Sequence, residues 1–352
     1  MINQAGPSYF DKENRIMDHY HIYHNEIPDY LHECMETPLV KRIKYIGMNC
    51  GCEYTAFPRF EDLDPYSRYD HSIGVALIVW HFTHDRRQAV AGLLHDAATP
   101  VFAHVVDFLH GDYLKQESTE DGTEMLIAGS AELQSVLRKY ELTTEDVCDY
   151  HRYPIADNDS PRLSADRLEY TIGNMINYRI CTMEEARCFY SDLTVGMNEN
   201  GDEELMFKHT HYAEAFAKAA LECARIYTSD EDRYAMQILS EILGCAIDRQ
   251  VIREDDLYAT EPEVIGKLLS DAHTASLWKH YCALSQIECA ARPGTEGCWR
   301  KVDAKKRYID PMVQGKGRTS ELSPTFSGLL SSFQNNDFDY WVCGRVSRGR
   351  FF

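Results

Sequence analysis

The sequence predicts a mainly α-helical fold with a few short strands in the C-terminal third. In residues 234–246 an apolar side chain returns every fourth position from Tyr234 to Ala246, and leucines widen the stripe. That period is typical of an amphipathic helix with one buried face. Residues 212–227 are rich in alanine and hold few helix breakers, which favours a second long helix.

Shorter helices are expected along the rest of the chain. The patterned segments, of which the first two are apolar enough to be buried, are 72–82, 88–96, 120–140, 143–151, 163–178 and 183–190. Breaker residues separate them at Pro58, Pro65, Pro100, 156–161 and 196–204. The last of these loops predicts a small hairpin. Residues 291–330, rich in Gly, Pro, Ser and basic side chains, predict short strands.

Length and charge predict one large domain with a distinct C-terminal part. The chain has 352 residues and a net charge of −20. We expect residues 1–290 to form the domain and residues 291–352 to be a basic elaboration packed on it. Residues 300–350 hold ten Lys and Arg against five acids. This basic part is either an anion-binding lobe or a solvated end of the chain. The remainder of the chain is acidic, which argues against non-specific binding to nucleic acid.

Cysteine usage and hydropathy predict a cytoplasmic protein that does not enter a membrane. The 12 cysteines show no disulfide framework spacing, and the first residues, MINQAGPSYFDKENR, are polar. The longest apolar stretch, 73–80, is too short to span a bilayer. Cys50 and Cys52 form the one close pair, but a structural zinc would need two more soft ligands at motif spacing.

The side chains that carry chemistry are His71, the doublet His95–Asp96, and Asp166. Two imidazoles and two carboxylates suit a divalent ion such as Mn, Fe, Co, Ni, Zn or Mg. A metal held this way usually activates water or polarises a phosphoryl oxygen, which indicates a hydrolase. The residues alone leave open a second reading, in which the four side chains form a hydrogen-bonded polar core.

The setting of the doublet favours ligation. The apolar run 89–94 buries the helix directly before His95 and Asp96, and a buried aspartate must be paired or bound to metal. A second doublet, His84–Asp85, lacks this buried approach and is followed by two arginines. We therefore interpret the second doublet as a solvated helix end.

Five segments in order resemble the HD-domain metal-dependent phosphohydrolase superfamily. They are ETPLVKRIKYI (36–46), SRYDHSIGV (67–75), HDAATPVFAH (95–104), SADRLEY (164–170) and KKRYIDPMV (305–313). Their flanks are most similar to the deoxynucleoside triphosphate triphosphohydrolase branch, which includes the dGTPases and the SAM- and HD-domain enzymes. The match runs from about residue 20 to 315. It implies an HD-domain helical bundle with a metal core at about 36–180 and a homo-oligomer of two or more copies.

The resemblance also implies roles for residues around the metal. His104 matches a histidine near the transferring phosphates, and it joins Asp96 as a candidate catalytic residue. Arg68 matches an arginine that contacts phosphate, Arg167 a cation facing the phosphates, and Tyr170 a tyrosine near the sugar. A core histidine, an ordinary salt bridge and a packing aromatic are the alternatives for His104, Arg167 and Tyr170.

Three positions depart from the triphosphohydrolase pattern. Thr99 stands where the branch has a histidine, and Gln116 with Glu117 stands where it has a His-Glu pair. Asn174 replaces an acid on the helix after Asp166. Gln116 remains a candidate substrate contact. The loss of two ionisable histidines predicts either a different substrate or a mechanism that depends on the metal and His104.

The segment that binds an activating guanine nucleotide in the vertebrate SAM- and HD-domain enzyme is also altered. Glu36, Lys41 and Lys44 differ from the residues that recognise that nucleotide. We therefore do not expect guanine nucleotides to activate this protein.

Three functions fit these observations. The first is hydrolysis of a (deoxy)nucleoside triphosphate or a related nucleotide by metal-activated water. The second is a phosphomonoesterase or phosphodiesterase on the same site. The third is a nucleotide-sensing protein without turnover. In each case the expected partner is a nucleotide or other phosphorylated small molecule, and neither a specific nucleic acid nor a membrane is expected.

Overall fold

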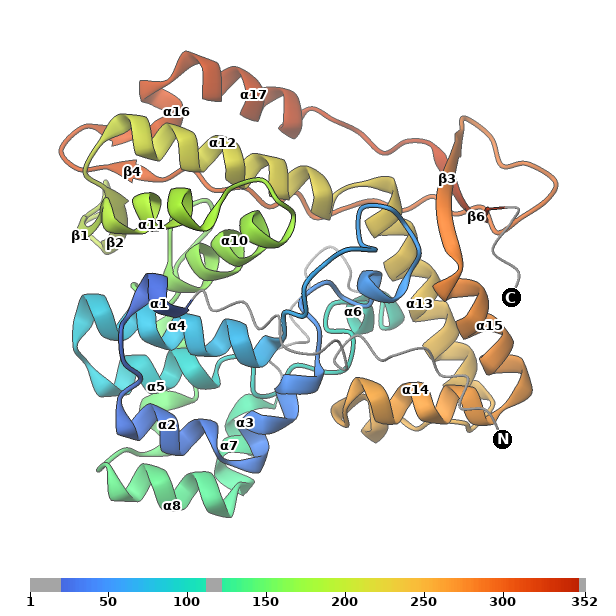
Figure 1. The fold of residues 1–352 in the computed structure, drawn as a ribbon, viewed down its shortest axis with the longest axis horizontal. Coiled ribbons are helices and arrows are strands. Elements are labelled where there is room, and N and C mark those ends of the chain that lie inside the picture. Colours follow the sequence, from blue (N-terminus) through green and yellow to red (C-terminus); the bar gives the residue numbers. More distant parts are fainter. Residues whose placement is uncertain (1–19, 112–121, 348–352) are drawn as a thin grey trace.

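The computed structural model describes residues 20–111 and 122–347, and helices dominate it (Figure 1). The helices are α1 (Tyr20–Tyr23), α2 (Asp29–Met35), α3 (Pro38–Arg42), α4 (Arg68–Thr83), α5 (Arg86–Leu94), α6 (Val105–Leu109), α7 (Thr123–Gly129), α8 (Ala131–Lys139), α9 (Thr144–Val147), α10 (Ala165–Asn177), α11 (Met183–Ser191), α12 (Thr210–Tyr227), α13 (Asp230–Asp248), α14 (Glu261–Ser270), α15 (Ala272–Cys282), α16 (Thr319–Leu322) and α17 (Pro324–Gln334). The mainly α-helical prediction is confirmed. Among these helices, none is long and apolar enough to cross a lipid bilayer.

The expected helices form, with three differences at their ends. Residues 120 and 121 of the expected helix 120–140 lie outside the described residues. The rest splits into α7 and α8, because the Ser130 hydroxyl caps α8 by accepting from the Leu133 amide at 3.4 Å. The segment 143–151 forms only α9 and then a 3₁₀ turn. The segment 88–96 ends at Leu94, so the His95–Asp96 doublet lies in the turn that follows α5 rather than within the helix.

Strands form two small sheets. The predicted hairpin around 196–204 is present as β1 (Leu193–Met197) and β2 (Glu203–Phe207), paired antiparallel. β2 pairs parallel with β4 (Met312–Val313), which pairs with β5 (Gly317–Arg318). A second sheet joins β3 (Leu284–Ala290) to β6 (Trp341–Val346). Residues 291–330 therefore contain short strands as expected, but also α16 and most of α17.

The main core surrounds α4, which is apolar on every face from Ile73 to Val79. α5 packs along it, and Gly92 permits close contact because an added Cβ there would meet the Val75 side chain at 3.2 Å. α10 packs on the opposite side. Gly74 makes room for Glu169 of α10, since a Cβ at 74 would lie 2.5 Å from the glutamate side chain. These contacts bring three ligand-bearing segments together.

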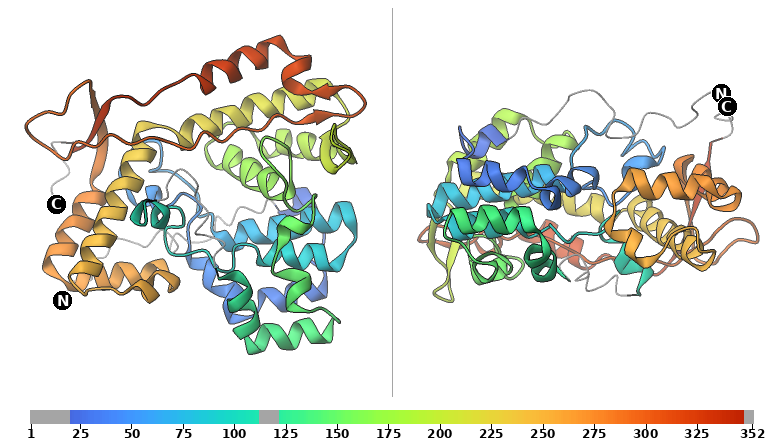
Figure 2. Two further views of the ribbon diagram at one scale, coloured as in Figure 1. Left: turned by 180° about the vertical axis from the view of Figure 1, so that it is seen from behind. Right: turned by 90° about the horizontal axis from the view of Figure 1, so that it is seen from below.

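A second core forms around α13, α15 and α6. Between the two cores, residues 299–311 form an extended segment, here called the C-terminal strap, which runs beside α12 from the β3–β6 sheet to β4 (Figures 1 and 2). Arg233 of α13 anchors the strap. Its guanidinium donates to the Val302 carbonyl, pairs with Asp230 and lies 4.3 Å from the Phe338 ring centroid.

Replacing Arg233 by alanine should destabilise the protein and loosen the strap. The side chain is only 1% exposed, so truncation leaves the Val302 carbonyl without its charged donor and opens a space beside Phe338. We expect a loss of about 3 kcal/mol in the free energy of unfolding, measured by urea denaturation. Arg225→Ala is the matched control, because Arg225 pairs with Glu222 at an exposed site and should change stability by less than about 0.5 kcal/mol. Equal losses in both variants would refute the anchoring role.

Candidate metal centre

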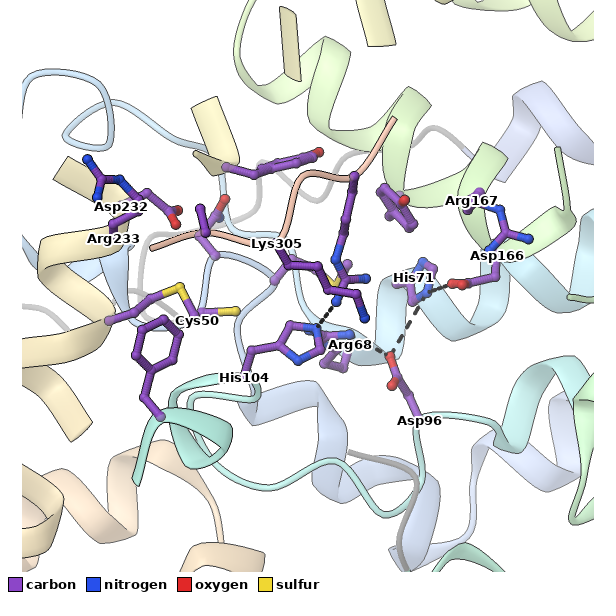
Figure 3. Close-up of a pocket in the computed structure, with 18 of the residues that line it drawn as sticks. Cys50, Arg68, His71, Asp96, His104, Asp166, Arg167, Asp232, Arg233 and Lys305 are labelled. Atoms are coloured by element: carbon purple, nitrogen blue, oxygen red, sulfur yellow. Dashed lines mark hydrogen bonds and ion pairs between the residues drawn. The ribbon is translucent and has the colours of Figure 1, made fainter. Parts of the chain in front are cut away.

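Helix starts and ends position the four predicted metal ligands. His71 lies in the first turn of α4, which is fixed by a capping box between Ser67 and Asp70. His95 and Asp96 follow the last residue of α5. Asp166 lies in the first turn of α10 (Figure 3). The structure thus brings all four side chains to one place, although they come from three separate segments.

The facing atoms of the ligands lie close enough to share one ion. The Nε2 atom of His71 is 3.2 Å from Nε2 of His95, 3.0 Å from Oδ1 of Asp166 and 3.9 Å from Oδ2 of Asp96. Nε2 of His95 is 3.6 Å from Asp96 and 3.7 Å from Asp166. Ligand atoms about 2.1 Å from one ion lie roughly 3.0–3.4 Å apart. The facing atoms of His71, His95 and Asp96 lie within 4.8 Å of one another, and Asp166 faces the two histidines, so small side-chain movements would complete a site for a divalent cation.

Hydrogen bonds behind the two histidines aim their Nε2 atoms at this point. Nδ1 of His95 donates to the Gly92 carbonyl at 2.7 Å. Nδ1 of His71 donates to Oε2 of Glu169 at 2.5 Å, and the Tyr66 hydroxyl donates to the same oxygen at 2.6 Å. Glu169 is completely buried. A carboxylate behind a ligating imidazole fixes its tautomer and makes it a stronger donor to metal.

Asp96 is held ionised by its neighbours. Its Oδ1 accepts from the Thr99 hydroxyl at 2.7 Å, and its Oδ2 accepts from the Arg68 guanidinium at 3.0 Å. Burial alone would raise the Asp96 pKa, but Arg68 and the two histidines outweigh it and hold the pKa far below its usual range. Arg42 donates to the carbonyls of Ala97 and Thr99, which fixes the turn that carries the ligand.

His71 and Asp166 show what competes with a metal ion. Burial lowers the pKa of His71, but hydrogen bonds with Asp166 and Glu169 outweigh it and raise the pKa to about 10. Burial raises the pKa of Asp166, and His71 more than reverses this, to about 2. The carboxylates of Asp166 and Glu169 thus favour a second proton on the His71 imidazole. A metal ion that binds this imidazole displaces that proton, so the affinity for metal rises with pH.

His104 lies beside the ligands in a separate hydrogen-bonded pair. Its Nδ1 lies 2.9 Å from Oδ2 of the buried Asp107, and its Nε2 lies 3.4 Å from Nη2 of Arg307. Burial lowers its pKa to about 4, Asp107 opposes the shift, and the charges of Arg307 and Arg68 add to it. The imidazole is therefore neutral near pH 7, with Nδ1 donating to Asp107 and the Nε2 lone pair facing Arg307.

These groups line a cavity of about 290 Å³ that opens from the ligands toward α13 (Figure 3). The C-terminal strap forms part of its wall and contributes Asp303, Lys305 and Arg307. Two of the basic residues near the C-terminus therefore lie at the metal centre, which supports the anion-binding reading of this part of the chain. Among the described residues, five cations and five aspartates line the cavity: Arg68, Arg167, Arg233, Lys305, Arg307, Asp96, Asp157, Asp166, Asp232 and Asp303.

The other predicted substrate contacts differ in their placement. Arg68 and Tyr170 line the cavity, and the Tyr170 ring centroid is 6.4 Å from that of His71. Arg167 also lines it, but its guanidinium donates to Arg162 and Asn158 and pairs with Asp157 at 3.2 Å, so it holds the loop before α10. Gln116 lies outside the described residues.

The two alternative metal motifs have structural explanations. Asp85 caps α5 by accepting from the Arg87 amide at 2.8 Å, and His84 stacks edge-on against Trp80. Cys50 and Cys52 are both buried thiols. Within residues 20–111 and 122–347, the one cluster of three or more metal-binding side chains is the buried set of His71, His95 and Asp96, and Asp166 faces its two histidines.

Sequence reasoning missed three residues of the site. Glu169 follows Asp166 by three positions, so helical spacing places both on one face, and this pattern was a usable signal. Asp107 stands in the same relation to His104. Arg307 gives no local signal of its contact with His104, because 203 positions separate the two residues.

Comparisons with known proteins agree with this picture. The chain matches no protein-family model. It is 28% identical over 247 residues to the uncharacterised protein YdhJ of Bacillus subtilis, covering 69% of this chain and 72% of that protein. It is 22% identical over 264 residues to the metal-dependent phosphohydrolase cns2 of Cordyceps militaris, covering 71% and 72%.

The fold is shared with a solved structure. A crystal structure of a phosphohydrolase from Bacteroides thetaiotaomicron superposes with a TM-score of 0.64 at 15% identity, over 92% of this chain and 97% of the other. The expected helical architecture is therefore found in a known protein. Together with the buried His-His-Asp cluster, these likenesses support the resemblance to the HD-domain phosphohydrolase superfamily, without distinguishing the triphosphohydrolase branch.

Proposed function

We propose that this protein is a metal-dependent phosphohydrolase that acts on a nucleotide, with a (deoxy)nucleoside triphosphate as the first candidate substrate. The observation that carries the proposal is the convergence of two imidazoles and two carboxylates in one wall of a cavity that is also lined by arginine and lysine. The similarity to the metal-dependent phosphohydrolase cns2 of Cordyceps militaris supports the reaction class.

The chain's own residues would bind and orient the phosphate. The chemistry that a divalent ion supplies on the four ligands is polarisation of a phosphoryl oxygen and activation of water. Arg68 presents its guanidinium to Asp96 and to the cavity, so it holds a ligand and faces the phosphate from one side. Lys305 and Arg307 face the cavity from the strap. Positioning and charge neutralisation of this kind supply most of the catalysis in phosphoryl transfer.

His104 would exchange a proton with the leaving oxygen. Burial lowers the imidazole pKa, and the charge of Arg307, which Nε2 faces, adds to the shift. A bound phosphate that pairs with Arg307 and Arg68 would offset the contribution of these charges and so raise the His104 pKa. Asp107 keeps Nδ1 protonated throughout, so that Nε2 is the atom that gains and loses the proton.

A nucleotide phosphomonoester or phosphodiester is the second candidate substrate, and the charge of the cavity favours it. Three of the five arginines and lysines in the wall pair with aspartates: Arg68 with Asp96, Arg167 with Asp157, and Arg233 with Asp230. A triphosphate would bring its additional negative charges into a wall that also holds aspartates. A single phosphate requires less countercharge.

A product screen tests the proposal. The protein, loaded in turn with Mn, Co, Mg, Fe or Zn, would be given ribo- and deoxynucleoside mono-, di- and triphosphates, and the products would be separated by ion chromatography. Triphosphate with free nucleoside would establish the first candidate, and single phosphate the second. Nucleotide binding with no product under any metal would refute hydrolysis and favour a sensor.

Substitution at the doublet should remove metal and activity together. His95→Ala or Asp96→Ala deletes a buried ligand, so we expect metal content, measured by mass spectrometry of the purified protein, to fall with hydrolysis. His84→Asn is the matched control in the solvated doublet, because asparagine tolerates the positive φ of 51° at that position. Activity retained in either ligand variant would eliminate this site.

His104→Ala should keep the metal and lose most of the rate. We expect kcat to fall on the order of 10²-fold, because the variant lacks the group that exchanges the proton, while metal content stays at the wild-type level. The control is His110→Ala, since His110 is exposed and pairs only with Glu254, at 3.6 Å, in the described structure. A kcat within about a factor of two of wild type would return His104 to a packing role.

A further inference from the structure

A row of tyrosines leads from the metal centre to the far end of the cavity. The ring centroid of Tyr170 is 6.4 Å from that of His71, that of Tyr227 is 6.5 Å further on, and that of Tyr178 another 6.5 Å. All three tyrosines line the cavity. This set is here called the tyrosine wall. Neighbouring rings are inclined by 67° and 59°, so the wall offers a series of aromatic edges and faces to a molecule in the cavity.

Two buried polar side chains lie where the wall ends. Asn49 is 6% exposed, and its Oδ1 accepts from the Tyr178 hydroxyl at 2.7 Å. Its Nδ2 is buried and, among the described residues, has no hydrogen-bond partner. A buried amide donor without a partner is uncommon in folded proteins. Asn49 also lines the cavity, so its unpartnered amide lies beside the space that a bound molecule would occupy.

Asp232 lines the same end. Figure 3 shows it on α13 with Arg233, across the cavity from His71 and Asp166. It is 9% exposed, and its carboxyl accepts a weak bond from the Cys52 thiol at 3.7 Å. Burial raises the pKa of Asp232 to about 8, and the carboxyl is therefore mostly neutral at pH 7. A neutral carboxyl presents one donor and one acceptor side by side.

Apolar side chains and one arginine surround this pair. The wall of the cavity includes Met48, Cys50, Phe108 and Met236, and Arg233 lies next to Asp232 on α13, where it pairs with Asp230. A sugar or a second phosphate would need several polar partners. A planar heterocycle needs only apolar contact on its faces and a few hydrogen bonds at one edge.

We propose that this end of the cavity is a nucleobase subsite, in which Asn49 and Asp232 hydrogen-bond the polar edge of the base and the tyrosine wall lies along the nucleoside. The inference rests on the proposed function, since it places the phosphate at the metal centre. It makes Asn49 and Asp232 the residues that determine specificity for the organic part of the substrate. The base contributes to binding, while the reacting groups stay with the metal ligands and His104.

The first experiment measures binding without turnover. Adenosine, guanosine, cytidine and uridine would be titrated calorimetrically into protein freed of metal with EDTA. We expect at least one nucleoside to bind, and Asp232→Ala and Asn49→Ala each to weaken its binding about tenfold. Glu231→Ala is the matched control, because it removes the neighbouring acid on α13, which does not line the cavity. No nucleoside binding, or equal binding by all variants, would overturn the subsite.

The second experiment separates this inference from the proposed function. Metal-loaded wild type and variants would hydrolyse a nucleotide and, in parallel, ribose 5-phosphate or ribose 5-triphosphate, which lack the base. We expect the Asp232 and Asn49 variants to raise KM for the nucleotide about tenfold and to leave the base-free substrate unchanged. Equal KM values for the nucleotide in wild type and variants would overturn the subsite even where hydrolysis is confirmed.

The two experiments together distinguish failure of the subsite from failure of the proposed function. Base-dependent binding without hydrolysis of any substrate would refute the proposed function and keep the subsite.

Asp232→Asn is a control for misfolding, because asparagine retains a donor and an acceptor at the same place. We expect Asp232→Asn to bind nucleosides more tightly than Asp232→Ala does. If Asp232→Asn melts at the same temperature as wild type but binds as weakly as Asp232→Ala, the hydrogen-bonding role of Asp232 is overturned.

Discussion

Buried charge in the wall of the cavity is the constraint on which the rest of this structure depends. His71, Asp96 and Glu169 are each more than nine-tenths buried, and buried ionisable groups persist only when they are paired, hydrogen-bonded or bound to a cation. The fold meets this requirement by packing α4, α5 and α10 so that Arg68 reaches Asp96 and Tyr66 reaches Glu169. A divalent cation held by His71, His95, Asp96 and Asp166 would neutralise the carboxylates that face the two imidazoles.

The resemblance predicted the four candidate ligands, and for the doublet burial also leaves a local trace in the sequence. The doublet His95–Asp96 follows a continuous apolar run, whereas His84–Asp85 stands among charged residues. The structure gives the two doublets different surroundings for the same reason: the first faces the cavity, and the second starts a helix at the surface. Residue type alone would not have separated them. The bounds of the helices were harder to predict than their existence. The expected helix 88–96 ends at Leu94, and the ring Nδ1 of His95 donates to the Gly92 carbonyl.

Contacts made by distant segments could not be predicted in this way. Arg307 reaches His104 from the strap, which Arg233 holds against α13. No sequence pattern at Arg307 or at His104 indicates the contact between them. The direction of Arg167 is a second case. A cation next to a ligand suggests a phosphate contact, but Asp157 and Asn158 lie closer in the folded chain and bind the guanidinium. Tertiary geometry, rather than propensity, decides both outcomes.

In the proposed mechanism, Thr99 affects how proton transfer is arranged, because the resemblance places a histidine at this position. Thr99 donates its hydroxyl proton to Asp96, so it orients a ligand and carries no proton that is exchangeable near neutral pH. Proton handling then falls to His104, which is linked to Asp107 and Arg307 and to none of the four ligands. Burial lowers its pKa, Asp107 opposes the shift, and Arg307 of the C-terminal strap and Arg68 of α4 add to it. Because Arg68 also binds the ligand Asp96, the metal centre and the proton-transfer group share one arginine, whereas Arg307 acts on His104 from a separate part of the chain.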